Sequence, residues 1–119
     1  MKRDYSNSGR VIEEYIRVIN KNTELFSTAN PDELLHTLIK FAELSGCSEY
    51  VISKDKYKVT LPLFVKKMEA RIEMKVEILK VDHETVCIDF TKKDGDSLAF
   101  YEAFNLAKSY FGELVDAHY

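Results

Sequence analysis

The spacing of apolar side chains along the chain predicts where the helices lie. A spacing of three or four residues, which is typical of amphipathic helices, recurs in residues 10–19, between Asn30 and Gly46, and in residues 97–116. The second segment begins at Asn30-Pro31, where the Asn side chain can accept hydrogen bonds from free N–H groups and Pro suits the first turn. Gly46 can adopt the left-handed conformation that often ends a helix. We therefore expect three helices.

Other segments alternate between apolar and polar residues, which is the period of a β-strand. Residues 70–80 show this most clearly, with apolar side chains on one side and charges of alternating sign on the other. Pro62 has no N–H to donate, which limits it to a sheet edge or a strand terminus. Strands are expected at residues 23–28, 50–52, 57–61, 70–80 and 86–90, of which the second and third flank a polar turn as in a hairpin.

The order of these elements predicts the fold class. Strands that follow one another through short turns pair in antiparallel fashion, and a single apolar face on the strongest strand means that helices cover one side of the sheet. We expect an α+β two-layer sandwich, with a four- to five-stranded antiparallel sheet and the helices packed on one face. Residues 1–22 are expected to be an N-terminal extension with a helix, and residues 23–117 to form the domain.

Length and charge narrow the classes of function. The chain has 119 residues and a net charge of −3, from 17 basic and 20 acidic side chains. That size suits one domain, and that charge excludes the strongly basic signature of a dedicated nucleic-acid binder. The charge is uneven, because residues 54–80 hold eight basic and four acidic side chains while residues 81–119 hold three and eight. The basic middle is either a solvated surface or a site for anionic lipid or an acidic partner.

No pattern of catalytic or metal-binding residues stands out. The three histidines and two cysteines lack the spacing that is typical of metal ligands. The four glycines are isolated rather than gathered in a phosphate-binding loop. We therefore expect no enzyme activity, no metal and no cofactor in this fragment. Cys47 and Cys87 are far apart in the sequence and are expected to be reduced thiols, as in cytosolic or nuclear proteins.

The last third of the chain resembles a known family. Residues 86–104 couple a strand to a Gly95-Asp96 turn and an amphipathic helix, which is similar to the end of a kinase-associated-1 domain. Upstream, residues 30–35 resemble the start of the first helix in that family, and residues 69–80 resemble its long strand. The resemblance covers residues 23–117 and implies the same α+β fold.

A second stretch is similar to one branch of this family. Residues 17–27 resemble the segment that opens the domain in the checkpoint effector kinase, although Glu24 and Leu25 depart from it. Domains of this family form the C-termini of Ser/Thr protein kinases. The resemblance implies a non-catalytic regulatory domain that restrains the kinase domain of the same chain by intramolecular contact. The alternative that it implies is membrane targeting through anionic phospholipids, and the net acidic charge favours the first role.

The two roles predict different sets of contact residues. Contact with the kinase domain is expected at Arg17, Lys21, Thr23, Gly95 and Asp96. Binding of an anionic phospholipid such as phosphatidylserine is expected at Lys54, Lys56, Lys58, Lys66, Lys67, Lys92 and Lys93. We expect a monomer that binds no nucleic acid. Its expected location is the nucleus or the cytoplasm, with peripheral association at the plasma membrane under the lipid alternative.

Overall fold

The computed structural model describes residues 9–16, 22–47 and 49–115. In this part of the chain the strands are β1 (Glu13–Glu14), β2 (Glu24–Ser27), β3 (Val51–Ile52), β4 (Lys58–Val65), β5 (Ala70–Lys80) and β6 (Val86–Gly95). The helices are α1 (Pro31–Leu44) and α2 (Ser97–Phe111), with short 3-10 turns η2 (Lys66–Met68) and η3 (Gly112–Leu114).

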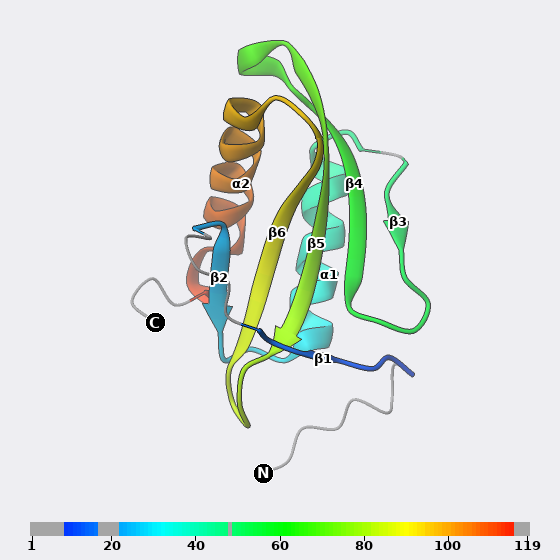
Figure 1. The fold of residues 1–119 in the computed structure, drawn as a ribbon, viewed down its shortest axis with the longest axis vertical. Helices are drawn as coiled ribbons and strands as arrows, with labels where there is room; N and C mark the ends of the chain where they lie inside the picture. Colours follow the sequence, from blue (N-terminus) through cyan, green and yellow to red (C-terminus); the bar gives the residue numbers. More distant parts are fainter. Residues whose placement is uncertain (1–8, 17–21, 48, 116–119) are drawn as a thin grey trace.

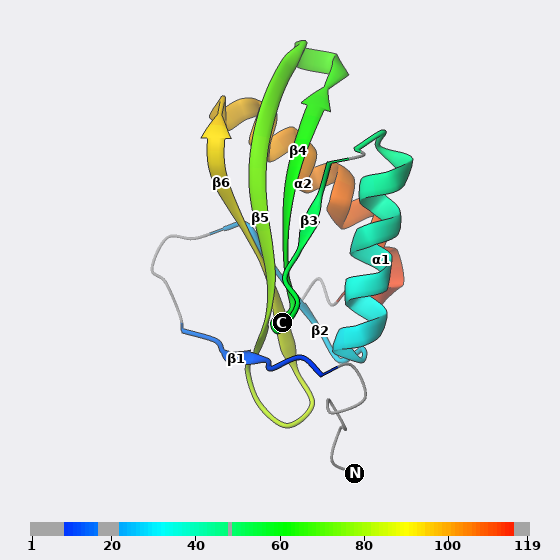
Figure 2. The same cartoon turned by 90° about the vertical axis from the view of Figure 1, so that its right-hand side faces the viewer.

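A single sheet holds all of these strands (Figure 1). Its order is β2-β6-β5-β4-β3, and β1 is added beside the end of β5. Neighbours in that order are antiparallel, whereas β1 runs parallel to β5. Both helices pack against one face of the sheet (Figure 2). The α+β class with helices on one face is therefore confirmed, but the sheet has six strands rather than four to five.

The two helices begin and end where their sequences favour it. The Asn30 side chain accepts a hydrogen bond from the N–H of Asp32 at 2.8 Å, and Pro31 occupies the first turn of α1. The Asp96 side chain accepts from the N–H of Ala99 at 2.9 Å and caps α2 in the same way. The final helix ends at Phe111, because Gly112 takes a positive φ, and not near residue 116 as expected.

The core lies between the helices and the inner face of the sheet. The alternation predicted for residues 70–80 is confirmed, since Ile72, Met74, Val76 and Ile78 are all buried against the helices. On the next strand Phe90 is buried too, and its ring meets that of Phe104 from α2 edge-on, with 5.0 Å between ring centroids.

Pro62 lies inside β4 rather than at its end, since the strand continues to Val65. The predicted hairpin is present, but β3 pairs only with Val59 and Thr60. The outer side of β4 has no strand neighbour at Pro62 among the described residues. Its place on a sheet edge is therefore as expected.

The helix expected at residues 10–19 is wrong for the part that the structure describes. Residues 11–15 are extended, and Glu13 and Glu14 pair with Leu79 and Lys80 of β5. An isolated helix of this length is marginal in water. As a strand, the segment satisfies backbone groups at the end of β5 that would otherwise lack a partner. Residues 17–19 of that expected helix lie outside the described residues.

We expect Gly95→Ala to destabilise the fold more than Gly46→Ala. Gly95 has a φ of +103°, and an added Cβ would lie 2.7 Å from the carbonyl oxygen of Arg71. Gly46 has a φ of +78° with open space around the same position. Gly46→Ala should therefore cost only the left-handed strain, about 1–2 kcal/mol, and Gly95→Ala roughly 1–3 kcal/mol more from the clash. Urea unfolding of both variants measures this, and equal losses would show that the β5 backbone moves aside.

Candidate functional site: an apolar groove between the two helices

The lysines expected to bind lipid do not form one patch. They fall into two groups, with Lys54, Lys56 and Lys58 around the start of β4, and Lys66, Lys67, Lys92 and Lys93 around the β4–β5 turn and the last part of β6. Lys58 begins β4 and Lys66 follows its last residue, eight residues on. At about 3.3 Å per residue, roughly 25 Å separates them along the strand. Lysines that are close in sequence are thus far apart in space.

Acidic residues share the second end with the lysines. Lys67 Nζ lies 3.9 Å from Glu102 Oε1, and Lys92 Nζ donates to the carbonyl oxygen of Gly95 at 2.9 Å. Asp94 and Asp96 are exposed in the same region, beside these lysines. This end of the molecule is therefore mixed in charge, and attraction to an anionic surface is correspondingly weak.

The residues expected to contact a kinase domain have structural tasks where the structure describes them. Thr23 is buried, and its hydroxyl donates to the carbonyl oxygen of Phe90 at 2.9 Å. Gly95 fits closely against the β5 backbone, and Asp96 caps α2. Two further residues, Arg17 and Lys21, lie outside the described residues. Thr23, Gly95 and Asp96 therefore hold the fold together, whatever else they contact.

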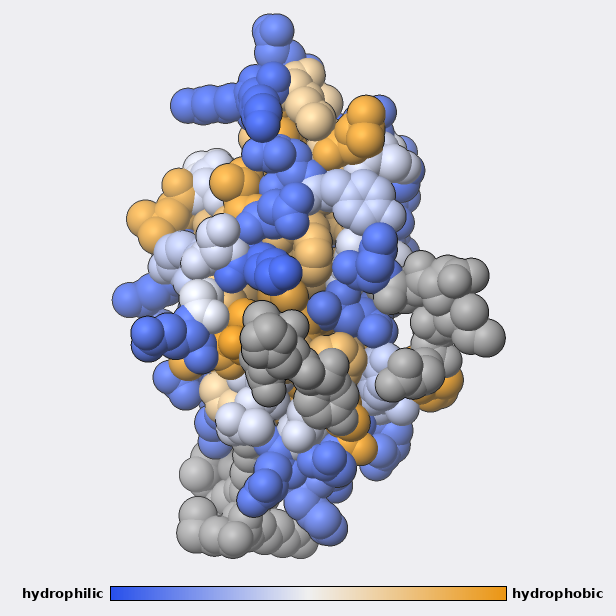
Figure 3. Space-filling model, turned by 90° about the vertical axis from the view of Figure 1, so that its left-hand side faces the viewer, coloured by the Kyte–Doolittle hydropathy of each residue, from blue (hydrophilic) through white to orange (hydrophobic). Residues whose placement is uncertain are grey.

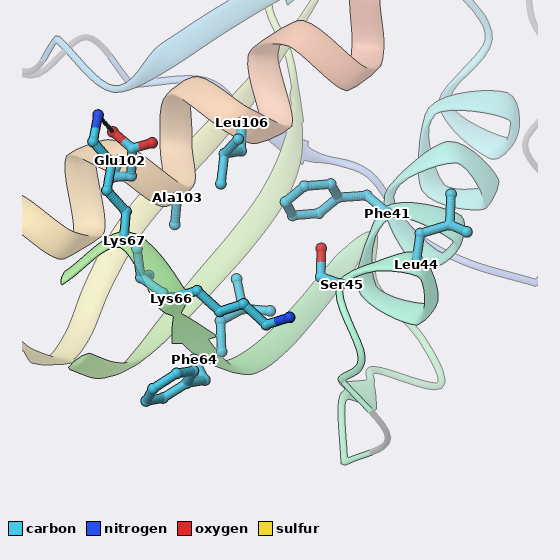
Figure 4. Close-up of a pocket in the computed structure, with 11 residues that line it drawn as sticks. Phe41, Leu44, Ser45, Phe64, Lys66, Lys67, Glu102, Ala103 and Leu106 are labelled. Carbon is cyan, nitrogen blue, oxygen red and sulfur yellow. Dashed lines mark ion pairs between the residues drawn. The ribbon is translucent and has the colours of Figure 1, made fainter. Parts of the chain in front are cut away.

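A groove lies between the end of α1, the middle of α2 and the end of β4 (Figure 4). It consists of two adjoining cavities of about 370 Å³ each, which share Phe41, Leu44, Ser45 and Leu106 as lining residues. We call it the α1–α2 groove. Volumes of this size are in the range of small binding pockets in proteins.

The walls of the α1–α2 groove are apolar and open to solvent. Leu44 is 74% exposed, Leu106 is 52% exposed and Tyr110 is 38% exposed. Single exposed apolar side chains are ordinary on protein surfaces, but several around one concavity mark a contact site. This groove is the feature of the described surface that most resembles a binding site.

One end of the groove carries positive charge. Figure 4 shows the Lys66 side chain extending toward Ser45, and both residues line the same cavity. Within the described residues the Lys66 ammonium makes no ion pair or hydrogen bond, whereas Lys67 is held near Glu102. The groove therefore suits a partner with apolar side chains and a carboxylate or carbonyl oxygen near one end.

The sequence contains a signal for this groove, although the pattern analysis did not use it. Leu98, Tyr101 and Leu106 belong to the broad apolar stripe of the last helix, yet all three are exposed. The smaller residues Ala99, Ala103 and Ala107 are buried instead. When the apolar stripe of a helix is wider than the surface that the sheet can cover, some of its side chains remain exposed to solvent. Apolar residues accordingly reach the surface in separate patches on the side that carries α2 and β2 (Figure 3).

Two further features of the described residues concern their titratable side chains. Among them, no three His, Cys, Asp or Glu side chains are placed to hold a metal ion. A hydrogen bond to Glu43 raises the pKa of Tyr50. Backbone N–H groups of Glu84 and Thr85 lower the pKa of Asp82 by bonding to its carboxylate. Neither shifted group lines the groove.

No family model matches the chain, and no curated protein matches it. Within the described residues, no helix has the length and apolar character needed to cross a membrane.

We expect the groove wall to be dispensable for folding. Leu106→Gln should change the free energy of unfolding by less than about 1 kcal/mol, because the side chain is half exposed. Leu38→Ala, at a fully buried position of α1, should cost about 2–5 kcal/mol. Urea unfolding of the two variants separates a surface role from a core role. A similar loss in both would make Leu106 part of the core.

Proposed function

We propose that this chain is a non-catalytic regulatory domain of a Ser/Thr protein kinase, which restrains the kinase domain of the same polypeptide by direct contact. The observation that supports this function best is the α1–α2 groove, an apolar concavity that no described segment of the chain fills. The resemblance of residues 23–117 to the kinase-associated-1 family suggests the partner. The agreement of the fold with the one expected for that family is consistent with it.

The chemistry of the groove defines what the kinase domain must offer. Burial of Leu44, Leu106 and Tyr110 removes apolar surface from water and supplies the main driving force for contact. A central apolar cluster with charge at its edge is the usual arrangement of a contact site. Lys66 at the edge of the groove adds orientation, because a carboxylate of the partner would pair with it. The contacting segment of the kinase domain should therefore be apolar with an acidic residue at one end.

We expect the domain, added in trans, to inhibit the catalytic domain of the same polypeptide. Leu106→Asp places a charge in the groove and should weaken the apparent inhibition constant at least about tenfold. Leu98→Asp is the matched control, because Leu98 is an exposed leucine of the same helix that does not line the groove. Kinase activity against domain concentration is the measurement. An equal effect of both variants would exclude the groove, and no inhibition by the unaltered domain would exclude the function.

The alternative function, binding of anionic phospholipid, has one observation in its favour. The turn between β4 and β5 carries Lys66 and Lys67 beside Met68, which is 39% exposed, and Phe64 is exposed on the adjoining strand. Lysines next to exposed apolar side chains suit a membrane surface. The acidic residues at the same end of the molecule oppose binding to an anionic membrane. Lipid binding therefore remains the alternative to kinase regulation.

We expect phosphatidylserine vesicles to bind the domain at low salt only. Sedimentation should fall when Lys66 and Lys67 are both changed to Glu, because they share a turn with the exposed Met68 and adjoin Phe64. It should not fall when Lys54 and Lys58 are changed in the same way, because they lie near the other end of β4. Near physiological ionic strength the interaction should be screened. Tight binding that persists there would make membrane targeting the main role.

A further inference from the structure

The sheet has a gap in its pairing at one end of β5. The pairing of β4 with β5 begins at Lys58, opposite Glu77, but β5 continues to Lys80. Beyond the start of β4, the edge of β5 is taken by β1, through pairs of Glu13 with Leu79 and Glu14 with Lys80. A strand edge with unpaired N–H and C=O groups is a template for another extended segment. Here residues 10–16 of the same chain are that segment, and we call them the strap.

A few specific contacts hold the strap. The N–H of Val11 donates to the carbonyl oxygen of Asp55 at 2.7 Å, and that of Tyr15 donates to Lys80 at 2.8 Å. The Tyr15 ring meets Phe26 edge-on, with 5.8 Å between ring centroids, and its hydroxyl donates to Glu24 at 3.1 Å. The strap therefore binds through backbone hydrogen bonds and through the side chain of Tyr15.

A charged pair and an apolar contact complete the interaction. Glu13 Oε1 lies 3.9 Å from Lys56 Nζ, with both side chains partly exposed. Ile12 packs against the edge of the core. In sequence order the strap thus presents an apolar residue, an acid, a spacer and an aromatic residue to the sheet.

The strap is poorly matched to this site in other respects. Val11 is 59% exposed and Ile16 is 76% exposed, so two of its apolar side chains gain little from the contact. The regular ladder is only two residues long. Segments with few buried apolar contacts open at a free energy well below that of global unfolding. The strap should therefore open at a lower free energy than the rest of the domain.

The surface beside the strap is apolar. Phe26 and Leu79 are the register partners of Cys87, and these three alternate with residues that point into the core. They therefore lie on the face of the sheet opposite the helices. Cys87 is fully buried there, although much of that face of β5 carries charged side chains. Because Tyr15 of the strap contacts Phe26, the register partner of Cys87, the Cys87 thiol is the probe chosen to test whether the strap is in place.

We propose that this end of the sheet is a strand-binding site for peptide segments, occupied in this structure by residues 10–16, which an extended segment of a partner protein can replace. Its ligand is a peptide that runs parallel to β5 and carries an apolar residue, an acid, a spacer and an aromatic residue in that order. Strand addition of this kind gains affinity from main-chain hydrogen bonds and specificity from alternate side chains. The site lies away from the α1–α2 groove and stands independently of the proposed kinase contact.

The test uses the full chain in a Cys47→Ser background and a synthetic peptide of residues 9–16, Gly-Arg-Val-Ile-Glu-Glu-Tyr-Ile. Tyr15→Ala should open the strap. The rate of Cys87 labelling should then rise at least about tenfold, and so should the rate of hydrogen exchange at the backbone N–H of residue 15. The peptide should then reverse the rise in Cys87 labelling. A tethered segment has an effective concentration of about a millimolar, so the peptide is added up to roughly that level.

Matched controls make each outcome decisive. Val11→Ser alters an exposed strap side chain and should leave Cys87 labelling unchanged. Lys56→Glu should weaken peptide binding about two- to fivefold, as expected for loss of an exposed ion pair, and a peptide of scrambled order should not bind. If Tyr15→Ala does not fold, Tyr15→Phe removes only the hydroxyl bond to Glu24 and gives a smaller rise in the same direction. Unchanged protection in the folded variant, or no response to the peptide, would overturn the proposal.

Discussion

The pairing of β5 along both of its edges is the constraint on which the rest of this structure depends. β5 is eleven residues long; β4 pairs with it in a continuous ladder, and β6 pairs with it in a ladder that shifts register once, between Glu73 and Met74. Because successive side chains point to opposite faces, its register fixes which residues of all three strands enter the core. The helices then have a single apolar face on which to pack. The same strand outruns β4 at one end, and that difference in length leaves the edge on which the strap lies.

The elements that could be predicted from the sequence are those whose local pattern agrees with their tertiary role. The alternation of residues 70–80 matches a half-buried strand, and Asn30-Pro31 marks a helix start that the fold uses unchanged. The helix predicted for residues 10–19 was wrong because the end of β5, far along the chain, offers an unpaired strand edge. Residues 13 and 14 pair with that edge instead of forming a helix. The pattern of apolar and polar residues in one segment does not show where β5 extends beyond β4. That overhang is defined only once the two strands are paired.

The candidate sites show the same division. Lys54 and Lys66 looked like parts of one basic cluster because a linear sequence does not show that β4 carries the chain from one end of the sheet to the other. The groove was hidden for the opposite reason. Leu44, Lys66 and Leu106 come from three elements that are distant in sequence, and no local pattern brings them together. What the sequence does contain is an excess of apolar residues on the last helix, beyond what one sheet face can bury.

The groove and the strand-binding site lie at opposite ends of β4, which raises the question of whether one can influence the other. Coupling between distant sites needs an element with two discrete arrangements that both sites bias. β4 is a poor candidate, because a slip of its eight-residue pairing with β5 by one position would turn its buried side chains to solvent. The strap lies beyond the start of β4, whereas the groove lies at its end, so the strap can open without moving β4. The two surfaces are therefore best understood as independent, and a partner that senses both must reach both itself.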